Sequence, residues 1–234
     1  TNCYAMKMAA RLERMGQPIY RGLTKPSKAG PVWTGAVELS NWGQVIKPLL
    51  WRKPAKIFAC SMSDLFHDAL PDAAIDQVFA VMALCPQHTF QVLTKRPERM
   101  RDYLGRDDRA GDIRSEINNQ GPGLGLTDQR IVSACHAISQ GPLPNVWLGV
   151  SVEDQATADA RVPILLDTPA AKRFVSAEPL LGPVDLHRLR APDGKHASAL
   201  QRQHDENFYE FDARLDWVIT GGESGPGARP AHPD

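Results

Sequence analysis

The sequence contains no apolar run near the roughly 20 residues that a membrane-spanning helix needs. Its 234 residues include only four cysteines, at positions 3, 60, 85 and 135. Cysteines this scattered do not form a disulfide framework, so we expect a reducing, cytoplasmic setting without membrane contact. Neither sign of charge is in excess, because 27 basic residues balance 27 acidic ones. A broad nucleic-acid-binding surface is therefore not expected, although this balance leaves room for a local basic patch.

Several familiar catalytic motifs are also missing. The chain has no Gly-x-Ser-x-Gly elbow of the serine hydrolases and no histidine and cysteine spacing typical of a zinc site. The glycine-rich segment 221–225 lacks the Gly-Lys-Ser/Thr ending of a phosphate-binding P-loop. A standard hydrolase triad, a zinc site and a P-loop nucleotide site are therefore unsupported.

What the sequence does have is five short apolar runs, each followed by polar residues. The runs cover residues 57–60, 90–93, 146–150, 174–175 and 217–219. Runs of this length, bounded by turn-forming residues, are typical of strands buried on both faces. Helical patterns alternate with them, which predicts a parallel sheet. We expect an α/β fold, a partial and TIM-like parallel (β/α) barrel, as one domain over residues 1–234.

The segments between the strands are expected to be mainly helical. Apolar residues at helical spacing predict helices over about 3–15, 39–49, 127–139 and 154–167, and others beginning at Pro71 and Pro97. Two polar stretches, 105–125 and 187–213, are predicted to be insertions, the first of them mobile. The start at Thr1 and the end just after a glycine-rich loop indicate a chain truncated at both ends.

The polar residues that follow the strands predict the active site. In parallel α/β folds the carboxyl ends of the strands build it, so acids, bases and hydroxyls gathered there indicate an enzyme. The side chains predicted to be catalytic are Lys95, Glu153, Glu178 and Glu223. The residues predicted to bind a cofactor beside them are Ser61, Ser63, Asp64, Thr94, Arg96, Ser151, Ser176, Gly221 and Gly222.

The residue types suggest what this edge can do. A carboxylate at a pocket rim can hold an amine, bind a metal or move a proton, and its structural alternative is to cap a helix or brace a loop. Glu153 shares the capping alternative with its neighbour Asp154. Lys95 and Arg96 stand beside a helix start, an arrangement that suits a carboxylate or phosphate. Gly221 and Gly222 let the backbone pass close to a ligand.

Cys3 is the one candidate metal ligand. It stands at the start of the first predicted helix, where the helix dipole favours a thiolate. A single cysteine does not hold a metal, so further ligands would have to precede residue 1. The other three cysteines lie on apolar faces and are predicted to be core residues.

Six segments together resemble a phage-associated bacterial family of unassigned function: residues 2–5, 61–67, 90–97, 146–153, 178–183 and 217–225. Members of that family carry three clustered cysteines that end in Cys-x-x-Cys-Tyr-Ala. That pattern resembles the radical SAM enzymes, which bind a [4Fe–4S] cluster through three cysteines in a partial (β/α) barrel. By this resemblance Cys3 is the third cluster ligand, and the first two belong to a longer form of the protein.

The resemblance implies a radical-SAM-like iron–sulfur enzyme that acts on an unknown substrate. Three thiolates leave one iron open to a chelating cofactor, here S-adenosylmethionine, which only the full-length protein would bind together with the cluster. Two alternatives stay open. One is a cluster-free barrel enzyme that uses its carboxylates with a divalent metal for hydrolysis or transfer. The other is a non-catalytic module that binds nucleic acid or a phage partner through Lys95, Arg96 and the two insertions.

Overall fold

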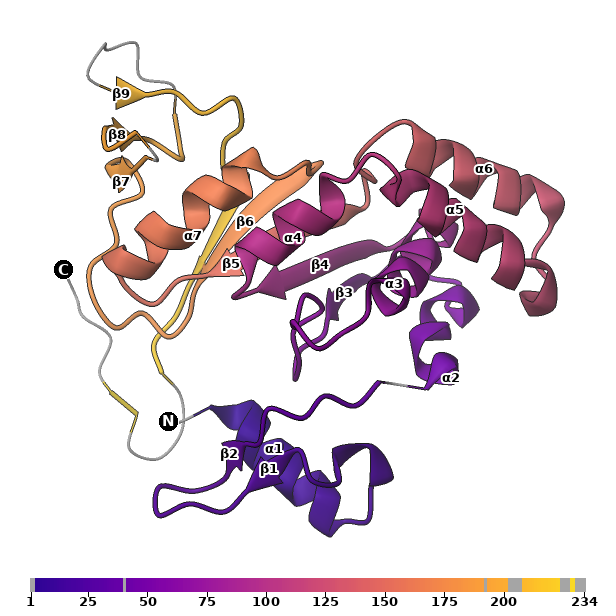
Figure 1. Ribbon diagram of the computed structural model, residues 1–234, viewed down its shortest axis with the longest axis horizontal. Coiled ribbons are helices and arrows are strands. Elements are labelled where there is room, and N and C mark those ends of the chain that lie inside the picture. Colours follow the sequence, from indigo (N-terminus) through magenta and orange to yellow (C-terminus); the bar gives the residue numbers. More distant parts are fainter. Residues whose placement is uncertain (1–2, 40, 192, 202–207, 224–227, 230–234) are drawn as a thin grey trace.

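The computed structural model describes residues 3–39, 41–191, 193–201, 208–223 and 228–229. Its centre is a five-stranded, all-parallel sheet that curls into a half-barrel (Figure 1). The strands are β3 (Lys56–Ala59), β4 (Thr89–Thr94), β5 (Val146–Ser151), β6 (Lys172–Ala177) and β10 (Trp217–Thr220). They lie in the order β10-β6-β5-β4-β3, so each strand of the sheet pairs with the next one along the chain. This confirms the predicted parallel α/β fold in its coarse form.

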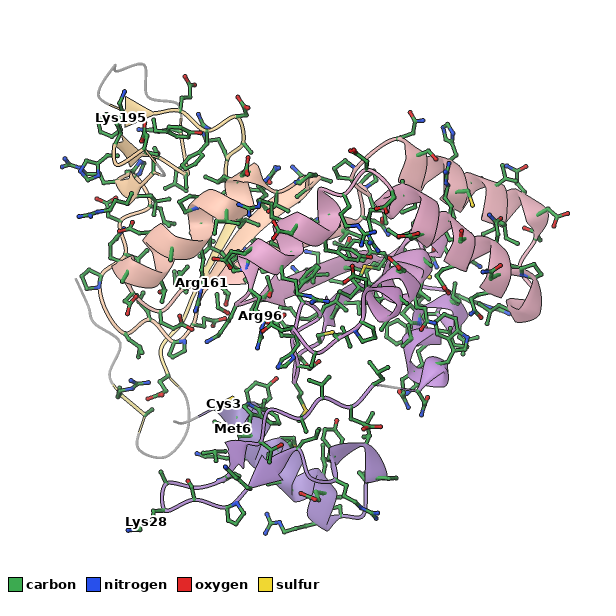
Figure 2. The ribbon with its side chains drawn as sticks, viewed as in Figure 1. Cys3, Met6, Lys28, Arg96, Arg161 and Lys195 are labelled. Carbon is green, nitrogen blue, oxygen red and sulfur yellow. The ribbon has the colours of Figure 1, made fainter. Side chains whose placement is uncertain are left out.

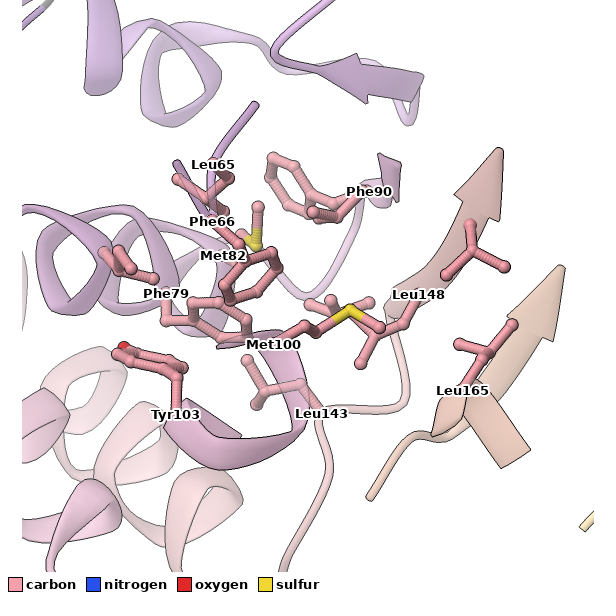
Figure 3. Packing of buried hydrophobic residues seen from close by; sticks show 14 of the residues in the cluster. Leu65, Phe66, Phe79, Met82, Phe90, Met100, Tyr103, Leu143, Leu148 and Leu165 are labelled. Atoms are coloured by element: carbon pink, nitrogen blue, oxygen red, sulfur yellow. The ribbon is translucent and has the colours of Figure 1, made fainter. Parts of the chain in front are cut away.

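Helices cover one face of the sheet because every second strand residue is apolar and points toward them. The covering helices are α3 (Asp72–Leu84), α4 (Pro97–Leu104) and α7 (Gln155–Asp167). Met82 of α3 and Met100 of α4 pack with Leu148 of β5 in one buried cluster (Figure 3). Alanine and β-branched residues fill the narrower gaps between the helices and the sheet.

The opposite face of the sheet carries aromatic side chains. Trp147, Phe174 and Trp217 occupy the alternate strand positions. The ring centroid of Trp217 lies about 6 Å from those of Trp147 and Phe174. Phe174 pairs with Gly149 in the register of β5 and β6. The Phe174 ring lies directly on the Gly149 backbone and is 1% exposed, whereas Trp217 is 41% exposed. This face is therefore the apolar concave side of the half-barrel.

The segment 105–125, which the sequence predicts to be a mobile polar insertion, is largely helical in the structure. Residues Arg109–Gln120 form helix α5, which packs with α3 and with α6 (Asp128–Ser139), and a short 3-10 helix, η3 (Pro122–Leu124), joins α5 to α6. Ile113 and Ile117 are buried at helical spacing. Polar residues dominate the composition because only this narrow stripe, with Arg109, faces the core.

The segment 187–213 also contains more structure than predicted. It forms a small sheet of β7 (Leu189–Arg190), β8 (His196–Ala197) and β9 (Phe208–Tyr209), and residues 192 and 202–207 lie outside the described part. Leu189 and Ala197 are fully buried, and β7 packs against α7. This second polar stretch is thus anchored to the domain through a few small apolar residues.

The first 50 residues form an N-terminal lobe and a connection. The lobe, residues 3–39, contains α1 (Tyr4–Arg14), η1 (Pro18–Tyr20), β1 (Thr24–Lys25) and β2 (Val32–Trp33). The connection contains α2 (Trp42–Val45) and η2 (Lys47–Leu50). In Figure 1 the lobe lies beyond the carboxyl ends of the strands. Among the described residues, no helix is both long enough and apolar enough to span a bilayer.

Candidate functional site

Asp64 organises the loops that follow β3 and β4. Its Oδ1 accepts hydrogen bonds from Thr94 Oγ1 at 2.7 Å and from the Phe66 amide at 3.0 Å. Its Oδ2 accepts from the Lys95 amide at 3.1 Å and from Arg96 Nη1 at 3.0 Å. With four donors around one carboxylate, Asp64 braces both loops. Asp64, Thr94 and Arg96, which the sequence places at one edge, therefore do meet there and are bound to one another.

Glu153 is held between two cations from different elements. Lys95 Nζ forms an ion pair with Glu153 Oε1, and Arg161 Nη1 donates to Oε2 at 3.0 Å. Arg161 Nη1 also donates to the Ser151 carbonyl at 2.8 Å, which ties α7 to the end of β5. The Glu153 side chain is 15% exposed and that of Lys95 is 55% exposed. The ammonium group of Lys95 is therefore the accessible end of this array.

We predict that Lys95→Ala changes the free energy of unfolding by less than about 1 kcal/mol. The reason is that the Lys95 end of the ion pair is solvated, and Glu153 keeps Arg161 as its second partner. Urea denaturation of the variant and the wild type measures this difference. A loss of more than about 2 kcal/mol would instead make Lys95 a structural residue.

Asp154, not Glu153, caps the helix that follows. Its Oδ1 accepts from the Thr157 amide at 2.8 Å, and Thr157 Oγ1 accepts in return from the Asp154 amide at 3.1 Å. These hydrogen bonds from Thr157 lower the pKa of the Asp154 carboxyl below its usual value. The reciprocal cap leaves Glu153 free of that role, which settles the competition between the two acids that the sequence left open.

The cap predicts a pH dependence of stability. Because the pKa of Asp154 is lower in the folded chain, its contribution is present above about pH 4 and is lost as the pH falls through the folded value. We expect Asp154→Ala to cost about 1 kcal/mol at pH 7. Asp154→Asn is the matched control, since it keeps the cap without the titration. The difference between Asp154→Ala and wild type, measured by urea denaturation, should shrink on acidification, and a constant difference would contradict the assignment.

The loops after β5, β6 and β10 are joined by backbone hydrogen bonds. The Leu181 amide donates to the Glu153 carbonyl at 2.8 Å, and the Leu180 amide donates to the Gly221 carbonyl at 2.9 Å. Ser176 Oγ donates to Glu178 Oε2 at 3.2 Å. The Glu178 carboxylate lies against Gly221, where any Cβ would collide with it. Gly221 thus lets a side chain of its own chain approach the backbone closely, and a larger residue here would displace the flexible Glu178 side chain.

Ser151 and Ser176 are neighbours in the register of β5 and β6, and both are buried.

Glu223 follows β10 after Gly222 and forms a bidentate pair with Arg229, with Nη2–Oε1 2.8 Å and Nε–Oε2 3.1 Å. This contact raises the pKa of the Arg229 guanidinium above its usual value. The glycine-rich loop continues through residues 224–227, which lie outside the described residues.

The loop after β3 connects the strand ends to the N-terminal lobe. Tyr4 Oη donates to the Ser61 carbonyl at 2.5 Å, and the Ser63 amide donates to the Cys60 carbonyl at 3.0 Å. Cys3 is the residue that begins α1, directly before Tyr4, and it is partly buried. Figure 2 labels Cys3 at this end of the lobe, and Arg96 and Arg161 at the strand-end edge that it faces.

The remaining cysteines do not surround Cys3 as a set. Within the described ranges, no three histidine, cysteine or acidic side chains gather as they would to hold a metal ion. Burial raises the pKa of the Cys60 thiol, and it raises that of Cys85 to about 11, so both stay protonated near neutral pH. Cys85 is fully buried as predicted, whereas Cys60 and Cys135 are only partly buried.

Some of the predicted strand-end residues are joined by a network of contacts. It joins Asp64, Thr94 and Arg96 on one side and Lys95 and Glu153 next to them. Two surface grooves lie elsewhere, one between α5 and α6 and one beside Gly105. Sequence reasoning missed Arg161 and Arg229, the partners of Glu153 and Glu223. Neither is marked by a motif, because each sits several residues beyond the acid it binds.

Comparison with known proteins adds one assignment. A family profile described as "Protein of unknown function (DUF5131)" matches residues 1–234, the whole chain. The chain belongs to the DUF5131 family. No curated protein and no solved structure matches it. The DUF5131 assignment confirms the expected family of unassigned function, while the phage association and the likeness to radical SAM enzymes remain predictions.

Proposed function

We propose that this DUF5131 chain is the barrel part of a radical-SAM-like iron–sulfur enzyme whose site is the carboxyl edge of the five-stranded sheet. One observation supports this most. The helix that Cys3 begins is hydrogen-bonded, through Tyr4, to the loop after the first strand of a half-barrel. A thiolate at this position would face the strand ends, where a partial, TIM-like barrel carries its chemistry.

The cysteine ligands available in this chain are too few to hold a cluster on their own. The described residues supply one thiolate, at Cys3, and no further group of ligands beside it. A [4Fe–4S] cluster needs three or four thiolates, so the proposal includes two cysteines outside the given sequence. When bound, such a cluster would supply one-electron chemistry on S-adenosylmethionine.

The chain's own residues have roles that do not depend on a bound cluster. The exposed ammonium of Lys95 is oriented by Glu153, which Arg161 in turn anchors to β5. That cation can bind a carboxylate or phosphate of a cofactor or substrate. The exposed carboxylate of Glu178, steadied by Ser176, can accept hydrogen bonds from an amine or hydroxyl. Both groups orient a ligand at the same edge of the sheet.

Anaerobic reconstitution of the full-length protein tests the proposal. We expect about four iron atoms per chain, and 5′-deoxyadenosine on reduction with S-adenosylmethionine present. Lys95→Ala should keep the iron and lose most of the 5′-deoxyadenosine. Arg114→Ala removes a cation on the exposed side of α5, serves as the control, and should keep both. A full-length protein that takes up no iron and cleaves no cofactor would overturn the proposal.

A further inference from the structure

The formal charge of zero conceals a strong separation of charge along the chain. Residues 1–56 contain ten lysines and arginines against two acids, whereas residues 57–234 contain 17 basic and 25 acidic residues. The first segment therefore has a net charge of +8 and the second of −8. Such asymmetry between parts of a chain is typical of a protein that binds a polyanion.

Six of these cations are on the N-terminal lobe, and we call them the basic surface: Lys7, Arg11, Arg14, Arg21, Lys25 and Lys28. All six are exposed. None of them forms an ion pair with a carboxylate in the parts of the chain that the structure describes. By contrast, arginines of the α3–α5 region are paired with aspartates. The basic surface is thus left with uncompensated charge, which attracts an anionic partner.

The arrangement of the basic surface is regular. Lys7, Arg11 and Arg14 recur at helical spacing, so they form one stripe along α1, whose Ala5, Met6 and Ala9 are buried. Lys25 and Lys28 belong to the β1–β2 hairpin, and Figure 2 shows Lys28 at its tip.

An exposed aromatic residue lies on the same hairpin as Lys25 and Lys28. Trp33 of β2 is 39% exposed, and it pairs with Thr24, the residue next to Lys25. A half-exposed indole on a lobe that also carries exposed cations suits a single strand, because the ring can stack on a base while the cations contact phosphates. A duplex would hide its bases from such a ring.

We infer that the N-terminal lobe binds single-stranded nucleic acid through the basic surface and Trp33. Binding is not sequence-specific, since phosphate contacts and stacking read no base edges. The hydrogen bond from Tyr4 to the Ser61 carbonyl ties this lobe to the loop after β3. The inference stands apart from the iron–sulfur chemistry, because it needs neither a cluster nor turnover.

Fluorescence anisotropy with a labelled single-stranded DNA 20-mer tests the inference. We expect the logarithm of the binding constant to fall with the logarithm of salt concentration with a slope of about −2 to −4, since three to six phosphates at roughly 0.7 each are engaged. Arg11→Glu/Lys25→Glu/Lys28→Glu should weaken binding at least about 30-fold. Arg114→Glu/Arg188→Glu/Arg190→Glu changes the net charge equally at exposed sites elsewhere and should stay within about threefold of wild type.

Two further arms separate the alternatives. Trp33→Leu should weaken the single-strand complex about tenfold while Trp33→Phe retains it, and circular dichroism verifies that each variant is folded. Lys25→Gln/Lys28→Gln, a milder change, should weaken binding by several-fold if the triple variant does not fold. The inference is overturned if both triple variants weaken binding equally, or if phosphatidylserine vesicles bind the protein and the oligonucleotide does not.

Discussion

Replacement of Asp76 by alanine should lower the free energy of unfolding by about 3–5 kcal/mol. Asp76 and Arg109 form an ion pair whose side chains are 8% and 5% exposed. Tyr103 Oη donates to Asp76 Oδ1 at 2.7 Å, and the Arg109 guanidinium lies 4.1 Å from the centroid of the Tyr103 ring. Without Asp76, the Arg109 charge stays buried between α3, α4 and α5 with only the more distant Asp72 and Asp112.

A double variant distinguishes the burial of an unpaired charge from a simple loss of contacts. Asp76→Leu/Arg109→Met removes both charges and fills the space, so it should recover most of the lost stability. Asp102→Ala is the exposed control, because the Arg101–Asp102 pair is solvated, and it should unfold near the wild-type denaturant midpoint. Urea denaturation measures all three variants. If Asp76→Ala unfolds at the wild-type midpoint, Arg109 is not held as described.

Gly149→Ala is expected to cost about 2 kcal/mol, within the 1–3 kcal/mol typical of overpacking. A Cβ at this position would lie 2.5 Å from Phe174 Cζ and 2.6 Å from both Cε atoms. The ring has little room to retreat, because Phe174 is 1% exposed and packs against Trp217. The strain falls on the concave side of the half-barrel, where β5 and β6 pair.

Two comparisons make this result specific to the Phe174 contact. Gly111→Ala adds the same methyl group within α5, where nothing lies within 4 Å, and should be neutral or stabilise by up to about 1 kcal/mol. In a Phe174→Leu background, Gly149→Ala should cost much less than it does in the wild type. Equal costs of Gly149→Ala in both backgrounds would show that the close contact is not responsible.

The strands and the edge where they end could be predicted from the sequence, because buried parallel strands are short apolar runs and their polar ends stand out. Thr94 and Asp64 were both placed at that edge by this pattern alone, and they hydrogen-bond to each other there. The sequence predicts where these residues lie better than it predicts what they do there. Asp64 braces loops, since one of its four donors comes from Phe66 nearby and the other three come from residues 30 to 32 positions further along the chain.

What the sequence concealed depends on tertiary partners. Helix α5 was missed because its inward stripe contains Arg109, a residue that is rarely buried without a partner, and that partner is Asp76 on α3. The pairing of Glu153 with Arg161 was missed for a similar reason, since the arginine lies on the outer helix α7 and carries no motif. Charge balance over the whole chain likewise concealed the basic surface, which becomes visible only when the cations are located on the lobe.

The proposed function depends on Cys3 as a cluster ligand at the carboxyl edge of the half-barrel. The most direct measurement is the iron content of the reconstituted full-length protein carrying Cys3→Ser, compared with Cys135→Ser. Cys135 is partly buried on α6, next to Asn118 and away from the sheet edge, which makes it a matched control. We predict that Cys3→Ser loses most of its iron while Cys135→Ser keeps about four atoms per chain. Full iron occupancy in Cys3→Ser would contradict the account.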